Sequence, residues 1–397
     1  MATTPAHPPT AETPSRGREF LLLLAVTTLF GLSFSTYFLL PKFLSVELAA
    51  SPATIGGVTT IFWLASVMVT PLVGQQIDRG GRRQSAALGG CLLALSCAGF
   101  IWIDSTGPLI WLLRIIQGMG FTLFYVAVAT LVADIAPPQR LAQALGWFGA
   151  VMIFTNAAGP AFAEWASATF GWPLVFAATA LCALLAAVGS RLLTEPAITH
   201  SGDRNTNLFQ VLHRPGMAPV IIVSALIGWV FGSLFTFYQP WALLQGIARV
   251  SDYLVAYAVA AVAMRILAGG AADRLGRVLV VRAMLFLYIL APLAVLWLDR
   301  FGLLLAGAML GVVQGVYYPA LNAIAIERAS AATRGKVMAA YNGAFNLGVS
   351  AAGLTLGHLV SARGYPTVFT LATAVGLLAF LVFALRGGSA AATPSRD

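Results

Sequence analysis

Residues 74–83 read GQQIDRGGRR, a short basic, glycine-rich stretch between two long apolar segments. A related stretch, GGAADRLGRV, occupies residues 269–278. The two aspartates, Asp78 and Asp273, lie 195 positions apart in a chain of 397 residues. A motif that returns after half the chain indicates that the protein is built from two similar halves.

Two further pairs of positions follow the same repeat. Gln117 and Gly118 are matched by Gln314 and Gly315, 197 residues later, and Gly159 is matched by Gly353 after 194 residues. Repeats that run in the same direction place a pseudo-twofold axis along the membrane normal. We therefore expect a central cavity between the two halves.

The composition excludes a water-soluble enzyme. Hydrophobic residues make up 59% of the chain, charged residues only 9%, and the mean hydropathy is +0.85, whereas soluble domains carry roughly 25% charged residues. A membrane-spanning helix needs about 20 mainly apolar residues. Twelve segments meet this requirement, at residues 20–44, 53–76, 84–103, 108–133, 142–166, 172–192, 218–243, 252–271, 279–298, 302–326, 337–361 and 366–386.

The sequence predicts an all-α integral membrane protein with both termini in the cytoplasm. In that orientation seventeen Lys and Arg residues face the cytoplasm and four face the opposite side, as the positive-inside rule requires. The predicted organisation is a disordered cytoplasmic tail at 1–18, a six-helix bundle at 19–192, a cytoplasmic linker at 193–217, a second six-helix bundle at 218–386 and a cytoplasmic tail at 387–397.

The motif at residues 74–83 resembles the signature G-x-x-x-D-R-x-G-R-R of the major facilitator superfamily (MFS). The second copy departs from it only at Val278, and residues 114–120 resemble the R-x-x-Q-G-x-G motif of the same superfamily. Gly146, Gly159 and Pro160 resemble part of the span-five motif of proton-coupled drug-efflux antiporters. The resemblance implies two pseudo-symmetric six-helix bundles, a monomer and transport by alternating access.

The resemblance also implies a cytoplasmic gate at each copy of the motif. A carboxylate at the end of one helix can accept hydrogen bonds from the free amides that begin another helix. The residues assigned to the gate are Gly74, Asp78, Arg79, Gly81, Arg82, Asp134, Asp273, Arg274 and Arg277.

Three residues are candidates for coupling transport to protons. Arg114 lies within an apolar span, where an arginine is costly. It has three possible roles: to tune a nearby proton site, to bind an anion, or to bond backbone carbonyls. Glu164 and His358 occupy equivalent positions of spans five and eleven. Such a carboxylate and imidazole could share a proton across the cavity, or be unrelated residues at its rim.

The predicted cavity combines aromatic rings with scattered hydrogen-bonding groups, which suits a small amphipathic organic compound. Its predicted lining is Tyr37, Gln117, Trp229, Phe237, Tyr238, Gln314, Tyr317, Tyr318, Asn322, Asn342 and Asn346. We expect no cofactor, no metal site, no nucleic-acid partner and no enzymatic activity. The predicted function is proton-coupled efflux across a bacterial inner membrane. The alternatives are an importer or symporter of an organic anion or metabolite and, more remotely, a membrane-embedded enzyme or a receptor.

Overall fold

The structure is a computed structural model that describes residues 14–136, 140–195, 216–268, 270, 274–329 and 334–387. The long helices of this part of the chain are α1 (Pro14–Thr36), α3 (Pro52–Gly80), α4 (Arg82–Gly99), α5 (Pro108–Ile135), α6 (Leu141–Phe170), α7 (Trp172–Ser190), α9 (Met217–Leu244), α10 (Asp252–Ala268), α12 (Arg277–Leu296), α13 (Arg300–Glu327), α14 (Arg334–Arg363) and α15 (Tyr365–Val382). Shorter elements are η1 (Tyr37–Leu39), α2 (Leu40–Val46), η2 (Phe100–Trp102) and η5 (Phe383–Gly387).

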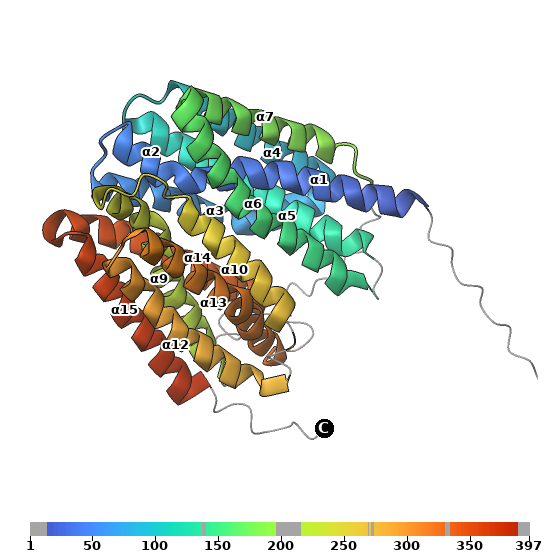
Figure 1. Cartoon of the computed structure of the whole chain (residues 1–397). Coiled ribbons are helices and arrows are strands. Elements are labelled where there is room, and N and C mark those ends of the chain that lie inside the picture. Colours follow the sequence, from blue (N-terminus) through green and yellow to red (C-terminus); the bar gives the residue numbers. More distant parts are fainter. Residues whose placement is uncertain are drawn as a thin grey trace, which may run out of the picture.

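These twelve long helices confirm the predicted all-α architecture. Within the described residues, eleven helical segments are long and apolar enough to cross a membrane, and α10, with 17 residues, is the remaining long helix. Helices α1–α7 form one bundle and α9–α15 form the other, and Figure 1 shows the two bundles side by side. We call them the N-terminal and the C-terminal bundle.

The first predicted span differs from the observed helix at both ends. Helix α1 begins at Pro14, so residues 14–18, which we predicted to be part of the disordered tail, are helical. After Thr36 the chain tightens into η1 and then restarts as α2, with Pro41 in its first turn. A proline lacks the N–H that a continuous helix needs and clashes with the carbonyl four residues earlier. Pro41 therefore divides the segment that we predicted to be one helix.

The repeat is visible in the turns between helices. Gly81 and Gly276 occupy the same position in the two copies of the motif, and their φ angles are 82° and 87°. Glycine adopts this left-handed region readily because it has no Cβ. Each glycine directly precedes a long helix, α4 or α12. The glycines of the motif therefore have a structural role in both halves.

Candidate functional site

One end of the molecule carries the two copies of the basic motif; we call it the Arg82 end. Arg82 Nε lies 2.7 Å from Asp134 Oδ2, and in the other bundle Arg277 forms an ion pair with Glu327. Each pair joins helices of a single bundle. Asp134 was predicted to be a gate residue. Glu327 was not, although it is the residue equivalent to Asp134 in the repeat.

The predicted gate is only partly covered by the structure. The side chains of Asp78 and Arg79, and the whole of Asp273, lie outside the described residues. Arg274 is exposed. A Cβ at Gly74 would meet no atom within 4 Å. Among the described residues no neighbouring helix packs closely on Gly74, and the gate assignment stays a prediction.

The two bundles touch at the opposite end, which we call the Lys42 end. A Cβ at Gly56 of α3 would overlap the carbonyl oxygen of Gly353 in α14, and one at Gly357 would crowd Ala53. Toward the Arg82 end of the same two helices, Gly74 and Gly343 face open space. Figure 1 shows the ribbons of the bundles diverging in this direction. The α3–α14 seam is therefore closed at the Lys42 end alone.

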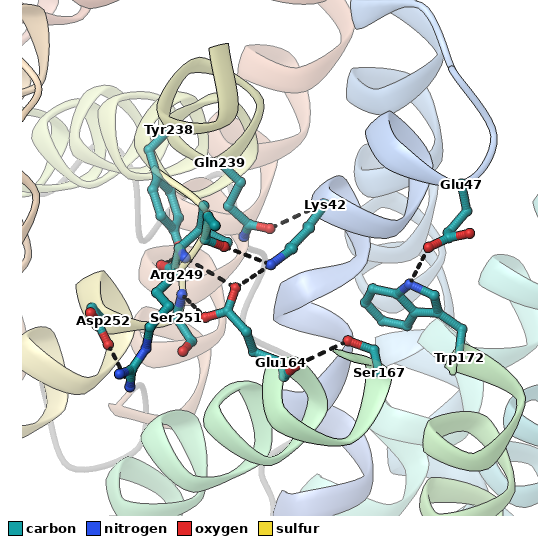
Figure 2. A network of polar contacts seen from close by, with 12 residues as sticks. Lys42, Glu47, Glu164, Ser167, Trp172, Tyr238, Gln239, Arg249, Ser251 and Asp252 are labelled. Carbon is teal, nitrogen blue, oxygen red and sulfur yellow. Dashed lines mark hydrogen bonds and ion pairs between the residues drawn. The ribbon is translucent and has the colours of Figure 1, made fainter. Parts of the chain in front are cut away.

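A network of polar contacts joins the bundles at the Lys42 end (Figure 2). Lys42 of α2 and Glu164 of α6 form an ion pair within the N-terminal bundle. Lys42 Nζ also donates a hydrogen bond to the Ala248 carbonyl oxygen (2.7 Å) in the connection between α9 and α10. The amides of Val250 and Ser251 donate to the two carboxylate oxygens of Glu164, at 3.1 and 2.8 Å. Both partners of the ion pair therefore bind the backbone of the connection between α9 and α10.

Gln239 of α9 extends this network. Its Oε1 accepts a hydrogen bond from the Lys42 amide (3.1 Å), and its Nε2 donates to the Phe38 carbonyl oxygen (2.6 Å). Glu164 is only 8% exposed, and Gln239 is fully buried. We call Lys42, Glu164, Gln239 and the backbone of residues 248–251 the latch. Because α10 begins at Asp252, the Glu164 carboxylate also lies at the positive end of that helix.

The latch changes the interpretation of Glu164. His358, the predicted partner, is exposed on α14, and the carboxylate of Glu164 pairs with Lys42 instead. Equivalent positions in the repeat do not bring the two side chains together here. Lys42 was not predicted to belong to the site. In the sequence it is one of the four Lys and Arg residues on the side opposite the cytoplasm, and no local pattern relates it to Glu164.

A pocket between the bundles lies next to the latch, and we call it the aromatic pocket. It is lined by Phe34, Tyr37, Phe38, Pro41, Thr59, Phe62, Trp63, Arg114, Phe231, Phe235, Thr236 and Val349. The last four belong to the C-terminal bundle. Phe38 and Phe235 meet edge to face across the boundary, with ring centroids 5.4 Å apart. The pocket is thus formed by both halves.

Arg114 is the one charged residue of this lining. It is 4% exposed, its Nε donates to the Val58 carbonyl oxygen (3.2 Å), and its Nη1 donates to Gln117. Its guanidinium carbon lies 4.5 Å from the centroid of the Phe62 ring. None of the ion pairs between described residues includes Arg114. The hydrogen bond to the backbone is thus present, and no described Asp or Glu forms an ion pair with Arg114.

Of the predicted cavity residues, Tyr37 lines the aromatic pocket and Gln117 supports Arg114. Phe237, Tyr238 and Tyr317 are fully buried in packing contacts and are not among the lining residues of this pocket. Tyr238, for example, stacks on Tyr253 with centroids 4.1 Å apart. The other predicted lining residues lie outside the pocket, and they are Trp229, Gln314, Tyr318, Asn322, Asn342 and Asn346.

The phenylalanines of the pocket were missed although the sequence contained a signal. Phe34 and Phe38 are one helical turn apart. Phe231 lies 197 residues after Phe34, and Phe235 lies 197 residues after Phe38. Gln239 follows Lys42 by the same interval. This offset equals that of the Gln-Gly pairs. A search for repeated aromatic residues, rather than for polar ones, would have found both walls.

Comparisons with known proteins agree with this architecture. The profile of the Major Facilitator Superfamily matches residues 21–299 and 248–396. An uncharacterized MFS-type transporter of Escherichia coli (strain K12), YhhS, is 23% identical, over 94% of this chain and 95% of its own. A solved structure of the nucleoside transporter NupG is similar, with a TM-score of 0.77 and 15% identity, covering 93% of this chain and 99% of that one. A bacterial homolog of the human lysosomal transporter Spinster, in an inward-facing and occupied conformation, has a TM-score of 0.77 and 14% identity, with 95% and 97% covered.

Proposed function

This chain belongs to the Major Facilitator Superfamily and is a multi-pass membrane transporter, and we propose that it exports a small amphipathic organic compound in exchange for protons. The proposed mechanism is alternating access, in which the two bundles rock about the central pocket. The proposed location is a bacterial inner membrane, with the Arg82 end in the cytoplasm. We propose a monomeric carrier without catalytic activity.

The observation that supports alternating access most strongly is the unequal packing of the two ends. At the Lys42 end, Gly56 and Gly353 bring α3 and α14 into backbone contact, whereas Gly74 and Gly343 of the same helices face open space. A carrier must close one end while the other is open. With the Arg82 end in the cytoplasm, this conformation opens inward and is the one that would load a compound for export.

In this proposal Glu164 is the proton-binding group. As a carboxylate it holds Lys42 and the amides of Val250 and Ser251. A proton would remove its charge, which would break the ion pair that positions Lys42 and weaken the charge-assisted hydrogen bonds that join the two bundles at the Lys42 end. Described charged or titratable groups around the latch include Arg249, Asp252 and Tyr238 (Figure 2), and Arg300 lies 3.9 Å from Asp252. Arg249 pairs with Asp252 (3.3 Å) rather than with Glu164.

The basic motifs would close the Arg82 end in the opposite conformation. Asp78, Arg79 and Arg82 of the first copy are the proposed gate residues, and Asp273, Arg274 and Arg277 repeat them. In support, Arg82 and Arg277 are already held by acids of their own bundles. The change Asp78→Asn is expected to leave insertion intact and to reduce transport strongly. Wild-type flux at equal expression would remove Asp78 from the gate.

One alternative keeps the carrier and reverses its direction. Because Arg114 lines the pocket between the bundles, uptake of an organic anion is the second candidate function. Both candidates use the same site and differ in the direction of transport and in the charge of the substrate.

Untargeted mass spectrometry of cells and medium tests the proposal. Cells that express the intact protein are compared with cells that express Asp78→Asn and with cells that carry the empty plasmid. Export predicts compounds that are depleted inside and enriched outside only with the intact protein. Compounds enriched inside would establish uptake instead, and identical profiles in all three cultures would contradict a transport function for these compounds.

A further inference from the structure

We propose that the aromatic pocket binds a small organic anion, whose single charged group pairs with Arg114 and whose ring or apolar body is held by phenylalanines of both bundles. The inference rests on the proposed carrier function and specifies the chemical class of its substrate. It concerns the pocket residues themselves and not the latch or the basic motifs.

The first argument is the missing counter-charge. The Arg114 side chain is buried within a membrane span, and the ion pairs between described residues do not include it. Removing a guanidinium from water without a compensating anion is costly. No Asp or Glu belongs to the described lining of the pocket. A bound anion would supply the negative charge that no described lining residue provides.

The second argument is the hydrogen-bonding capacity of Arg114. A guanidinium has five N–H donors, and two hydrogen bonds to described residues use its Nε and Nη1. These bonds to Val58 and Gln117 fix the orientation of the group, while Nη2 donates to no described residue. The planar arrangement of donors matches a carboxylate. The side chain is therefore held in place with donors to spare.

The wall of the pocket is largely aromatic and is formed by both bundles. The aromatic lining of the pocket includes Phe34, Phe38 and Trp63 of the N-terminal bundle. It also includes Phe231 and Phe235 of the C-terminal bundle. Phe34 and Trp63 meet edge to face, with centroids 6.4 Å apart. Such edges and faces hold a ring or a compact apolar body. A ligand here would touch both halves and would be released when they separate.

The repeat places no second cation at the position equivalent to Arg114. The position equivalent to Arg114, 197 residues later, is Gly311 in α13. A Cβ there would overlap the carbonyl oxygen of Tyr257, so the C-terminal bundle fills with backbone the space that Arg114 uses in the other. The pocket therefore favours a ligand with one anionic group at one end over a symmetric dianion.

Binding to the purified full-length chain in detergent tests the inference. The probes are benzoate and 2-naphthoate. Each is compared with the corresponding neutral carboxamide and with the corresponding arylmethylamine, so that the ring is constant and the charge is −1, 0 or +1. Affinity is measured by equilibrium dialysis and by the ligand-dependent rise in melting temperature. We expect the carboxylates to bind more tightly than the amides and the amines.

Three variants place the binding at the pocket. Arg114→Gln is expected to weaken carboxylate binding by about 30-fold or more, as the loss of one partner of a buried charge pair does. Arg114→Lys retains the charge and should bind with intermediate affinity. Arg363→Gln, at an exposed arginine of α14, should bind like the wild type. If Arg114→Gln does not fold, Phe235→Leu is the second test and should weaken 2-naphthoate more than benzoate.

Carboxylates that bind no better than amides or amines, or that fail to bind at all, would overturn the inference. Unchanged carboxylate affinity in Arg114→Gln, or in both Arg114→Lys and Phe235→Leu, would do the same. Flux through the same protein in lipid vesicles separates this result from a failure of the carrier proposal. Flux of neutral or cationic compounds with no carboxylate binding would refute the anion alone, whereas carboxylate binding without flux would refute the carrier alone.

Discussion

The two bundles repeat the same helices but differ in their charges. Arg114 in the N-terminal bundle corresponds to Gly311 in the other, and Glu164, buried in the latch, corresponds to the exposed His358. Lys42 corresponds to Gln239, and these two residues meet through a hydrogen bond. The N-terminal bundle thus supplies the buried charges of the site, and the C-terminal bundle supplies backbone amides, carbonyls and rings to receive them.

The two seams between the bundles differ in the same way. The α3–α14 seam consists of close backbone contacts at Gly56 and Gly353 together with a hydrogen bond from Thr60 to the Ser350 carbonyl oxygen. The seam between α6 and the start of α10 is held by hydrogen bonds from the Val250 and Ser251 amides to Glu164 and from Lys42 to the Ala248 carbonyl oxygen, and the Lys42–Glu164 ion pair within the N-terminal bundle positions both side chains. The first depends on shape and is insensitive to protons, whereas the second contains a group that a proton can neutralise. The predictions below separate these two kinds of closure.

The largest effect is expected from Gly56→Val, which destroys the shape-dependent seam. Its side chain would overlap the backbone of α14 at Gly353, and backbone cannot move aside as a flexible side chain can. Overpacking costs about 1–3 kcal/mol or more, so flux in vesicles should fall by roughly 10-fold to 100-fold. Gly17→Val, where a Cβ meets no atom within 4 Å, is the control. Equal flux in the two variants would show that the seam does not need to close.

The next effect is expected from Glu164→Gln, which removes the charge of the latch. Breaking a fully buried ion pair costs about 3–5 kcal/mol, but water reaches this pair because the Lys42 side chain is 17% exposed, so we expect a smaller loss of flux than for Gly56→Val. Flux should lose its dependence on an imposed pH gradient. Combining the change with Lys42→Met in a double-mutant cycle measures the pairing itself. A gradient response that persists in Glu164→Gln would remove Glu164 from proton coupling.

A smaller effect is expected from Gln239→Leu, which keeps the volume and removes two hydrogen bonds between the bundles. The Lys42 amide and the Phe38 carbonyl would lose their partner, at about 1–3 kcal/mol for an unsatisfied buried group. The pH dependence of flux should be retained, because the ion pair is intact. If Gln239→Leu abolishes that dependence, Gln239 is more than a passive part of the latch.

The smallest effect is expected from Arg249→Gln. Its side chain is 71% exposed and pairs with Asp252 three residues later, and exposed pairs contribute about 0.2–1 kcal/mol. The melting temperature and the flux should stay close to the wild-type values, and any change should fade as the salt concentration rises. A large loss of flux would place Arg249 in the latch beside Glu164.

The sequence was most informative where a feature repeats or has a characteristic length. Twelve apolar segments became twelve long helices, and the glycines of the basic motifs became turns before α4 and α12. The break at Pro41 was missed because a single proline near the end of a long apolar segment does not show where a helix restarts. Asp134 and its acidic counterpart Glu327 each pair with the arginine of the motif in their own bundle, and their role in the gate stays a prediction.

The site was harder to predict because it depends on which helix face points inward. Polar and aromatic residues of α9 and α13 were selected by type, yet Phe237 and Tyr317 are buried in packing. The phenylalanines that line the pocket were overlooked because apolar rings are ordinary in an apolar span. Lys42 and Glu164 are 122 residues apart, and no local pattern relates them. Only the folded bundle brings them to the same connection.

The most direct test of the account is a pair of distances measured by spin labelling in lipid vesicles. After replacement of Cys91, Cys97 and Cys182, one label pair is placed at Phe170 and Leu244, at the Lys42 end, and another at Leu72 and Leu267, toward the Arg82 end; all four side chains are exposed. The account predicts that Glu164→Gln, or acidification of the Lys42 side, lengthens the first distance and shortens the second. If both distances stay as they are in the wild type at neutral pH, the latch does not control access and the central claim is wrong.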